Sequence, residues 1–477
     1  MSTAVTLKTR DGGSTALSPE HLDGLRAKLR GAVCLPGDPG YDQARTLWNA
    51  MIDRKPAVTV RALGASDVIH AVRFAREHGL LLAVRGGGHN IAGNAVCDGG
   101  LQLDLSLMRS VRVDPVAKTA RVEPGAILGD VDKETQAFGL AVPLGVNSTT
   151  GISGLTLGGG FGWLSRKYGL TIDNLLSVDL VTANGALVHA SDKENHDLFW
   201  AVRGGGGNFG VVTSFEFRLH AIGTELLTGV IIHPLAKAKE ILTGYRRVVS
   251  QAPDDLAVWF VMRKAPPLPF LPAEHHGTDV LVLALCWSGD IDAGRGPVGA
   301  IQGLGKPLAE IIGPMPFVAW QQLLDPLLTP GFRNYWKSQS FTELSDGAID
   351  TLIDAAKRIP SAESEIAFAQ VGGAINRVPA GATAYPHRNL QFVLNEHTRW
   401  SEPAKDKECI AWARKLFDDM APFATGGVYV NFMPEEETLK NRPGAYGTNI
   451  EKLTQVKAKL DPDNLFRMNQ NIAPAPR

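Results

Sequence analysis

The sequence predicts an α+β protein built from two structural parts, and three observations lead to this prediction. From Ala57 onward, amphipathic helical segments alternate with short apolar runs that have the length of strands. Dense glycine clusters occur up to about residue 210 and then stop, and after about His220 strands alternate with longer helical segments. The length of 477 residues also exceeds that of one ordinary globular domain.

The N-terminal elements follow from signals for the start and the end of helices. A short amphipathic stretch runs from Pro19 to Leu29. Ser66 is expected to cap a helix whose apolar residues share one face, and Gly79 is expected to end it. The run from Leu80 to Val84 then predicts a buried strand.

The rest of the first part contains a second helix and a hairpin. The helix is expected at about 128–138, ending at Gly139, with a strand at 140–143 behind it. Asn184-Gly185 separates two apolar runs, which is a strong hairpin signal. We therefore expect strands at 175–182, 186–190 and 211–219, and a helix at 196–202.

The second part begins at about residue 220, and a Pro-rich loop at 265–272 interrupts its predicted strands. From Gly427 onward we expect a strand, a helix at 450–460 and a turn at Asp461-Pro462. The other strands of this part are expected at 229–233, 256–262, 280–287, 335–341, 365–371 and 389–395.

Composition excludes several classes of partner. Lys and Arg total 48 against 49 Asp and Glu, so the formal net charge of −1 gives no electrostatic reason to expect nucleic acid or an anionic membrane. No apolar run approaches the roughly 20 residues that span a bilayer, and the N-terminus lacks the apolar region of a secretion signal. We expect a cytoplasmic protein. The four cysteines lack CxxC spacing, so neither a disulfide framework nor a metal site is expected: Cys34, Cys97, Cys286 and Cys409.

The first glycine cluster is the segment RGGGHN at 85–90, directly after a predicted strand. Three glycines remove every Cβ, so successive backbone N–H groups can converge on an anion such as a pyrophosphate. His89 ends this loop and could reach a bound cofactor. A tight surface turn with an incidental histidine explains the same residues equally well at this point.

The second cluster places six glycines between Gly151 and Gly162, which is too dense for a stable helix or strand interior. Apolar residues such as Phe161 and Trp163 argue against a flexible linker. We therefore expect a backbone laid flat against a large planar ligand.

The third cluster contains GxGxxG at Gly205, Gly207 and Gly210. A dinucleotide fingerprint must follow a strand and open a helix, whereas this one follows a predicted helix and opens a strand. A nicotinamide-binding Rossmann domain is therefore disfavoured, and the absence of GxxxxGK[ST] excludes a P-loop.

Taken in order, these segments resemble the FAD-binding domain of the vanillyl-alcohol-oxidase superfamily, and specifically its berberine-bridge-enzyme-like branch. The resemblance runs from about Arg54 to the end and is weakest between roughly 225 and 425. The bacterial 6-hydroxynicotine oxidases are the nearest relatives that it suggests. The matching segments are RGGGHNIAG (85–93), GISGLTLGGGFGWLSRKYGLTIDNLLSVDLV (151–181), LFWAVRGGGGNFGVV (198–212) and YGTNIEKLTQVKAKLDPDNLFRMNQNI (446–472).

The resemblance implies a bipartite FAD-binding domain of the PCMH type and a separate substrate domain. The first would comprise residues 1–220, with its core at about 54–220. The substrate-binding domain would comprise residues 221–429 and use an antiparallel sheet, flanked by helices, as the roof of the flavin. Residues 430–477 would return to the FAD-binding domain.

FAD is the implied cofactor, and His89 matches the histidine that attaches covalently to the flavin 8α-methyl group. The tail residues Asn469 and Gln470 match the segment that folds back beside the flavin. The other implied FAD-binding residues are Arg85, Gly86, Gly87, Gly88, Asn90, Asn147, Thr150, Gly151, Ser153, Gly154, Gly158, Asp173, Val212 and Asn431.

Three positions depart from the family pattern. Asn147 stands where many members have a cysteine that forms a second bond to FAD, so a single link through His89 is predicted. Phe161 stands where plant members have a tyrosine that helps to deprotonate the substrate. Thr150 occupies the position that gates oxygen, where valine or isoleucine is usual, and so leaves oxidase and dehydrogenase both open.

The implied activity is hydride transfer from a small alcohol, amine or sugar to the flavin, with dioxygen or another acceptor taking the electrons. Tyr429 is the preferred active-site phenol, although a tyrosine that only hydrogen-bonds a carbonyl is the alternative. Lys337 could act as a desolvated base or be a solvated edge lysine. Strand alternation places Gln391, Val393 and Asn395 on one face, which makes Gln391 and Asn395 candidates.

Plant relatives have a lysine and a glutamine near the positions of Val393 and Asn395, so a base supported by lysine is not evident here. Two other classes of function stay open. One is a flavin dehydrogenase or oxidative cyclase that uses the same cofactor. The other is a flavin-binding module without enzymatic activity.

Overall fold

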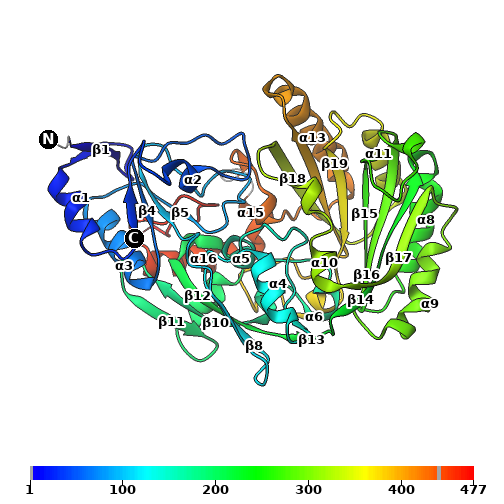
Figure 1. Cartoon of the computed structure of the whole chain (residues 1–477), viewed down its shortest axis with the longest axis horizontal. Helices are drawn as coiled ribbons and strands as arrows, with labels where there is room; N and C mark the ends of the chain where they lie inside the picture. The colour runs from blue at the N-terminus through cyan, green and yellow to red at the C-terminus, as the bar shows by residue number, and fades with distance from the viewer. Residues whose placement is uncertain (1–3, 438–441, 477) are drawn as a thin grey trace.

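The computed structural model describes residues 4–437 and 442–476. Two smaller sheets and the C-terminal segment lie at one end of the molecule, and a large sheet backed by helices lies at the other (Figure 1). Mixed helices and sheets confirm the α+β prediction. The short elements outside the main layers are β1 (Val5–Lys8), β2 (Ser14–Leu17), α1 (Pro19–Arg26), β9 (Leu140–Ala141), β13 (His220–Ala221), α6 (Ser165–Tyr168), α10 (Phe317–Gln321), α12 (Ala374–Arg377) and α15 (Arg442–Tyr446).

The first of the smaller sheets has four strands in the order β3 (Ala32–Cys34), β4 (Val58–Arg61), β6 (Leu101–Asp104) and β5 (Leu82–Arg85). β4 and β5 run parallel to β6, so the carboxyl end of β5, where the RGGGHN loop begins, lies beside that of β6. Helix α3 (Ala65–Glu77) buries its apolar face with the residues of this sheet, and Gly79 follows it with φ of +62°, as predicted. The cap residue is Gly64 rather than the predicted Ser66, which lies inside the first turn.

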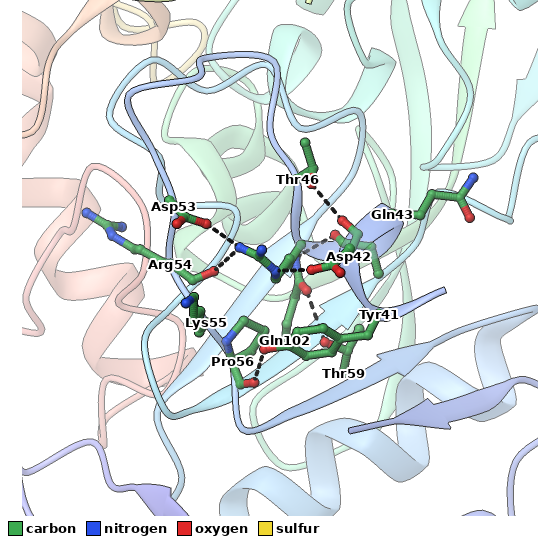
Figure 2. A network of polar contacts seen from close by, with 12 residues as sticks. Tyr41, Asp42, Gln43, Thr46, Asp53, Arg54, Lys55, Pro56, Thr59 and Gln102 are labelled. Carbon is green, nitrogen blue, oxygen red and sulfur yellow. Dashed lines mark hydrogen bonds and ion pairs between the residues drawn. The ribbon is translucent and has the colours of Figure 1, made fainter. Parts of the chain in front are cut away.

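A polar network fixes the segment around α2 (Tyr41–Arg45) against this sheet (Figure 2). The Tyr41 hydroxyl donates to the Pro56 carbonyl at 2.7 Å, and Gln102 Nε2 donates to the Ala44 carbonyl at 3.1 Å. Further along, the Trp48 backbone N–H donates to the Gly88 carbonyl at 3.1 Å. The segment therefore holds the glycine loop in place from the outside.

The second sheet has five strands, and the hairpin of β10 (Leu175–Val181) and β11 (Leu187–Ser191) forms one edge of it. The hairpin turns at Asn184-Gly185 as predicted, with Gly185 at φ of +75°. Helix α5 (Ile152–Leu157) runs through Gly154, so the prediction that the second glycine cluster is free of helix is wrong for these six residues. The strands and remaining helices of this layer are β11 (Leu187–Ser191), β10 (Leu175–Val181), β12 (Val211–Arg218), β8 (Thr119–Val122), β7 (Val111–Asp114), α4 (Leu128–Gln136) and α7 (His196–Val202).

The third sheet is antiparallel, with seven strands in the order β17, β14, β16, β15, β19, β20 and β18. Four helices cover one of its faces, and the other face points toward the glycine clusters (Figure 1). The strands are β14 (Glu225–Pro234), β15 (Leu256–Lys264), β16 (Asp279–Trp287), β17 (Ala309–Pro316), β18 (Arg333–Phe341), β19 (Glu365–Gln370) and β20 (Phe392–Trp400), and the helices are α8 (Ala238–Val249), α9 (Ile291–Gln302), α11 (Asp346–Ala356) and α13 (Asp406–Met420).

The predicted strands of this sheet are confirmed in place, except that β20 begins three residues later than expected, at Phe392 instead of Asn389. The edge strand β17 has no counterpart in the prediction, because its sequence AEIIGPMP contains a glycine and two prolines, which are poor strand formers. Its backbone forms a strand because it pairs along one side only, with β14.

The C-terminal segment packs against the third glycine cluster. Helix α16 (Ile450–Leu460) matches its prediction, but the strand expected from Gly427 is wrong, since those residues are irregular up to a short 3₁₀ turn at Val430–Phe432. Lys457 Nζ forms a fully buried ion pair with Asp461 at 2.7 Å and also donates to the carbonyls of Asn208 and Phe466. This pair fixes the tail beside the glycine-rich loop.

The four cysteines are buried thiols with no disulfide between them. Across 4–437 and 442–476, the helices all fall short of the length and apolarity that crossing a membrane would require.

Candidate active site

A cavity with a volume of about 350 Å³ lies between the glycine clusters and the open face of the seven-stranded sheet. Most of the sequence-predicted site residues meet there, although they come from six separate parts of the chain. The predicted residues that line it are Gly86, Gly87, Gly88, His89, Asn90, Asn147, Thr150, Gly151, Ser153, Gly154, Val212, Asn395, Tyr429, Asn431, Asn469 and Gln470.

The first two glycine clusters meet each other directly. A Cβ on Gly87 would lie 2.4 Å from the Gly151 Cα, so no side chain fits at this crossing. A Cβ on Gly154, by contrast, would meet no described atom within 4 Å, because this glycine borders the cavity. The clusters therefore form a wall of bare backbone.

Polar atoms in this part of the cavity lack partners among the described residues. Asn94 Nδ2 and Asn469 Oδ1 are both buried and make no hydrogen bond within 4–437 and 442–476. Leaving a buried polar group unpaired costs about 1–3 kcal/mol. A bare backbone wall with unpaired amide groups fits a long polar cofactor such as FAD.

The side chain of His89 is held by a hydrogen-bond chain that fixes its tautomer. Asn147 Oδ1 accepts from the Thr149 backbone N–H at 3.0 Å, which orients the amide, and it also accepts from the Thr149 hydroxyl at 2.7 Å. The Thr149 proton is thereby used, so its Oγ1 can only accept from His89 Nε2–H, 3.0 Å away. The lone pair of His89 therefore lies on Nδ1.

Burial keeps this imidazole neutral. Desolvation, with a smaller contribution from the positive charge of Arg399, lowers the pKa of His89 to about 3. The ring also stacks on Trp48, with ring centroids 4.6 Å apart and planes inclined by 22°. His89 is thus a fixed, uncharged imidazole with a nucleophilic nitrogen.

The sheet face opposite the glycine wall is hollowed in its centre. Ala367 and Ala369 on β19 lie between larger neighbours on the adjacent strands, and Trp259 and Trp336 stand to either side of them. Small residues on β19 leave room for a ligand between two indole rings.

Tyr429 crosses from the tail segment into the same cavity. Its hydroxyl oxygen accepts from the Gly160 N–H at 3.0 Å and from Asn431 Nδ2 at 2.9 Å. Burial raises the pKa of Tyr429 to about 12, although these two hydrogen bonds oppose the shift, so the phenol stays protonated. Its geometry is that of a hydrogen-bond donor to a ligand rather than of a base.

One polar row crosses four adjacent strands on the cavity face, and sequence reasoning missed it. Register pairs Arg263 with Glu365, Glu365 with His397, and His397 with Trp336. Alternation from Asn395 would place His397 on the same face, but only the strand register brings the four side chains together.

Lys337 and Gln391 are predicted site residues that the structure places elsewhere. Lys337 points to the helix-covered face of β18, where it pairs with Glu437 and lies 3.8 Å from the Phe417 ring centroid. The sheet alternates its side chains, so Trp336 and not Lys337 faces the cavity. Gln391 precedes β20 and is exposed, outside the set of described residues that line the cavity.

Three predicted FAD-binding residues also have other partners. Arg85 donates to the carbonyls of Gln43 and Ala44, and the side chain of Asp173 forms a buried bidentate ion pair with Arg388, at 2.7 and 2.8 Å. A Cβ on Gly158 would contact the Asn431 side chain instead of the cavity. Arg85 and Asp173 thus have partners within the protein, which the motif alone does not reveal.

Comparison with known proteins gives the same family over most of the chain. Residues 56–191 match the family described as FAD binding domain, and residues 428–473 match the family described as Berberine and berberine like. An FAD-linked oxidoreductase of Dictyostelium discoideum is 32% identical over 94% of this chain and 95% of its own length. The chain belongs to the berberine-bridge-enzyme-like family. It is accordingly an FAD-binding oxidoreductase.

Other members of the family are equally well covered. (R)-6-hydroxynicotine oxidase of Paenarthrobacter nicotinovorans is 31% identical over 94% of this chain and 97% of its own length. Among solved structures, BBE-like 1 of Physcomitrella patens has a TM-score of 0.86 at 26% identity, covering 96% of this chain and 99% of its own. The fold and the family thus agree with the resemblance that the glycine clusters show.

Proposed function

We propose that this protein oxidises a small organic substrate of the alcohol, amine or sugar type, using an FAD attached through a single covalent bond to His89. The observation that carries the proposal is the free lone pair on His89 Nδ1, fixed by Thr149 and Asn147. When bound, FAD supplies a two-electron acceptor for hydride from the substrate. The protein's contribution is to bury, orient and deprotonate the imidazole before attachment.

A single link follows from the donor set at the cavity wall. Asn147 has an amide where a thiol would be needed for a second bond, and both of its oxygen contacts are already made to Thr149. The tail residues Asn469 and Gln470 and the backbone around Gly154 would hold the nucleotide. The same arrangement favours a division into an FAD-binding part (1–220 with 430–477) and a substrate-binding part (221–429).

Attachment is tested by acid precipitation and peptide mapping of the purified protein. Flavin fluorescence should stay with the pellet, and a single peptide, the one that contains His89, should carry it. His89→Ala should release all flavin to the supernatant, whereas the exposed His196→Ala should not. Flavin found entirely in the wild-type supernatant would contradict the covalent link.

We further propose dioxygen as the electron acceptor, supported by the similarity to (R)-6-hydroxynicotine oxidase, which its name describes as an oxidase. Mixing the photoreduced protein with aerated buffer in a stopped-flow instrument should restore the oxidised flavin spectrum within seconds. A flavin that stays bleached for many minutes would instead indicate a dehydrogenase, the second candidate function. The Thr150 side chain at the cavity wall is compatible with either activity.

A further inference from the structure

The polar row on the cavity face contains a histidine whose outer nitrogen makes no hydrogen bond to the described part of the chain. His397 Nδ1 lies 3.2 Å from Glu365 Oε1, and Arg263 Nη1 donates to Glu365 Oε2 at 2.6 Å. His397 lines the cavity while being only 4% exposed, and its Nε2 makes no hydrogen bond within 4–437 and 442–476. Glu365 therefore holds His397 through Nδ1, and Nε2 is available to a ligand in the cavity.

The charge on Glu365 determines which nitrogen of His397 carries the proton. Although burial alone would raise the pKa of Glu365, the Arg263 charge and the His397 hydrogen bond lower it to about 2, so the carboxylate is ionised and can only accept. His397 Nδ1 must then donate, and Nε2 is left with a lone pair. This is the arrangement of a base positioned by a carboxylate.

Beside the His397 ring lies a hydrogen-bond donor that has no partner among the described residues. Trp336 Nε1 is likewise buried and makes no hydrogen bond to a described residue, and its ring meets that of His397 edge to face with centroids 4.6 Å apart. An acceptor next to a donor is complementary to a hydroxyl group, which donates through its hydrogen and accepts through its oxygen. An ammonium group is not complementary to this pair, because it has no lone pair to offer Trp336. The positive charges of Arg263 and Arg399, which lie near enough to lower the pKa of His397, would also repel it.

On the basis of the proposed function, we propose that the substrate is an alcohol and that His397 Nε2 takes the proton of its hydroxyl group, with Trp336 donating to the hydroxyl oxygen. The O–H bond breaks and its proton moves to Nε2. The electron pair of the carbinol C–H bond leaves as hydride to oxidised FAD, the acceptor that the family provides, and the substrate becomes an aldehyde or ketone. Glu365 and Arg263 are positioning residues, since they act through His397.

This arrangement predicts the pH dependence of flavin reduction. Burial lowers the pKa of His397, the hydrogen bond and charge of Glu365 raise it, and the charges of Arg399 and Arg263 lower it, with a net shift below the ordinary value of 6.5. The neutral form is the base, so the rate of reduction should be constant at neutral pH and fall only in more acidic solution. Lys337 and Glu396 lie on the opposite face and do not contribute directly.

The test uses the flavin-loaded enzyme and anaerobic stopped-flow mixing with a panel of aliphatic and benzylic alcohols, sugars, and the amines that match the simple alcohols. With the best alcohol, His397→Gln should slow flavin bleaching by about 10²–10⁴-fold while the flavin content stays unchanged. Glu365→Gln should also slow it and shift the pH profile. Glu396→Gln, one residue away on the opposite face, is the matched control and should stay within about twofold of wild type.

The outcomes separate the two proposals. If an alcohol bleaches the flavin equally fast in His397→Gln, the role of His397 is wrong while the proposed function stands. If only amines bleach it, the substrate class is wrong, and if nothing in the panel does, the proposed function is contradicted as well.

A second measurement does not depend on turnover. In ¹⁵N-histidine-labelled protein, with and without flavin, the ring signal that disappears in His397→Gln should show Nδ1–H and a bare Nε2 at neutral pH. A proton on Nε2 would overturn the inference.

Discussion

Replacing Thr149 by valine should slow covalent attachment of the flavin without removing the histidine that forms the bond. Valine has nearly the same volume but no oxygen, so the buried His89 Nε2–H loses its acceptor. The imidazole is then free to move its proton to Nδ1, and this proton blocks the nitrogen that we propose as the nucleophile.

The magnitude follows from the hydrogen bond that is lost. An unpaired buried N–H costs about 1–3 kcal/mol, and each 1.4 kcal/mol changes a population about tenfold. The reactive tautomer should therefore be depleted by about 5- to 150-fold, and the attachment rate should fall by the same factor. Thr149→Ser retains the hydroxyl and should stay close to wild type.

The assay is a time course of acid-stable flavin after FAD is added to protein produced without it. Thr156→Val is the matched control, because Thr156 is buried in the neighbouring helix α5 and its hydroxyl contacts no acceptor or donor in the described chain. Attachment in Thr149→Val at the wild-type rate would refute the claim that Thr149 sets the tautomer. A slow Thr156→Val would show that the effect comes from general loosening of this segment.

Three other results are expected. Attachment should be independent of pH between about 5 and 8, since the pKa of His89 is lowered to about 3 and the ring is neutral throughout; a rate that rises across this range would contradict a pre-formed neutral imidazole. Gly87→Ala should abolish flavin retention because its Cβ would collide with Gly151 backbone, and normal flavin content in this variant would show that the loops can separate. Tyr429→Phe should lower the free energy of unfolding by about 1–3 kcal/mol in urea titrations, as it leaves the buried Gly160 N–H unpaired, and an unchanged midpoint would count against that contact.

The wall of the FAD site could be predicted because its information is local. Gly87 and Gly151 are required where the two loops cross backbone to backbone, and the glycine density that marks both loops is visible in the sequence without any knowledge of distant contacts. The departure at Asn147 was equally readable. The support that Asn147 gives to the His89 tautomer through Thr149 could not be read from the sequence, since no motif describes a hydrogen-bond chain.

The catalytic candidates were predicted less well, because they depend on strand register. Strand alternation identifies which residues share a face, but it does not say which face of β18 points to the cavity. The packing of α13 against that strand places Lys337 on the helix-covered face and leaves Trp336 facing the cavity. The late start of β20 likewise removed Gln391 from the sheet.

The sequence by itself determined the glycine-rich wall, the place of His89 at the end of the first glycine loop and the positions of most strands, because bare backbone, capping glycines and residue alternation are properties of short segments. The cofactor class followed from the resemblance of these segments to a known family. Only the tertiary structure decided which charged groups have partners within the protein, as Asp173 and Arg85 do, and which row of side chains faces the cavity. Arg263 lies 102 residues before Glu365, and Glu365 lies 32 residues before His397. The three become neighbours because hydrogen bonds between β15, β19 and β20 fix their register.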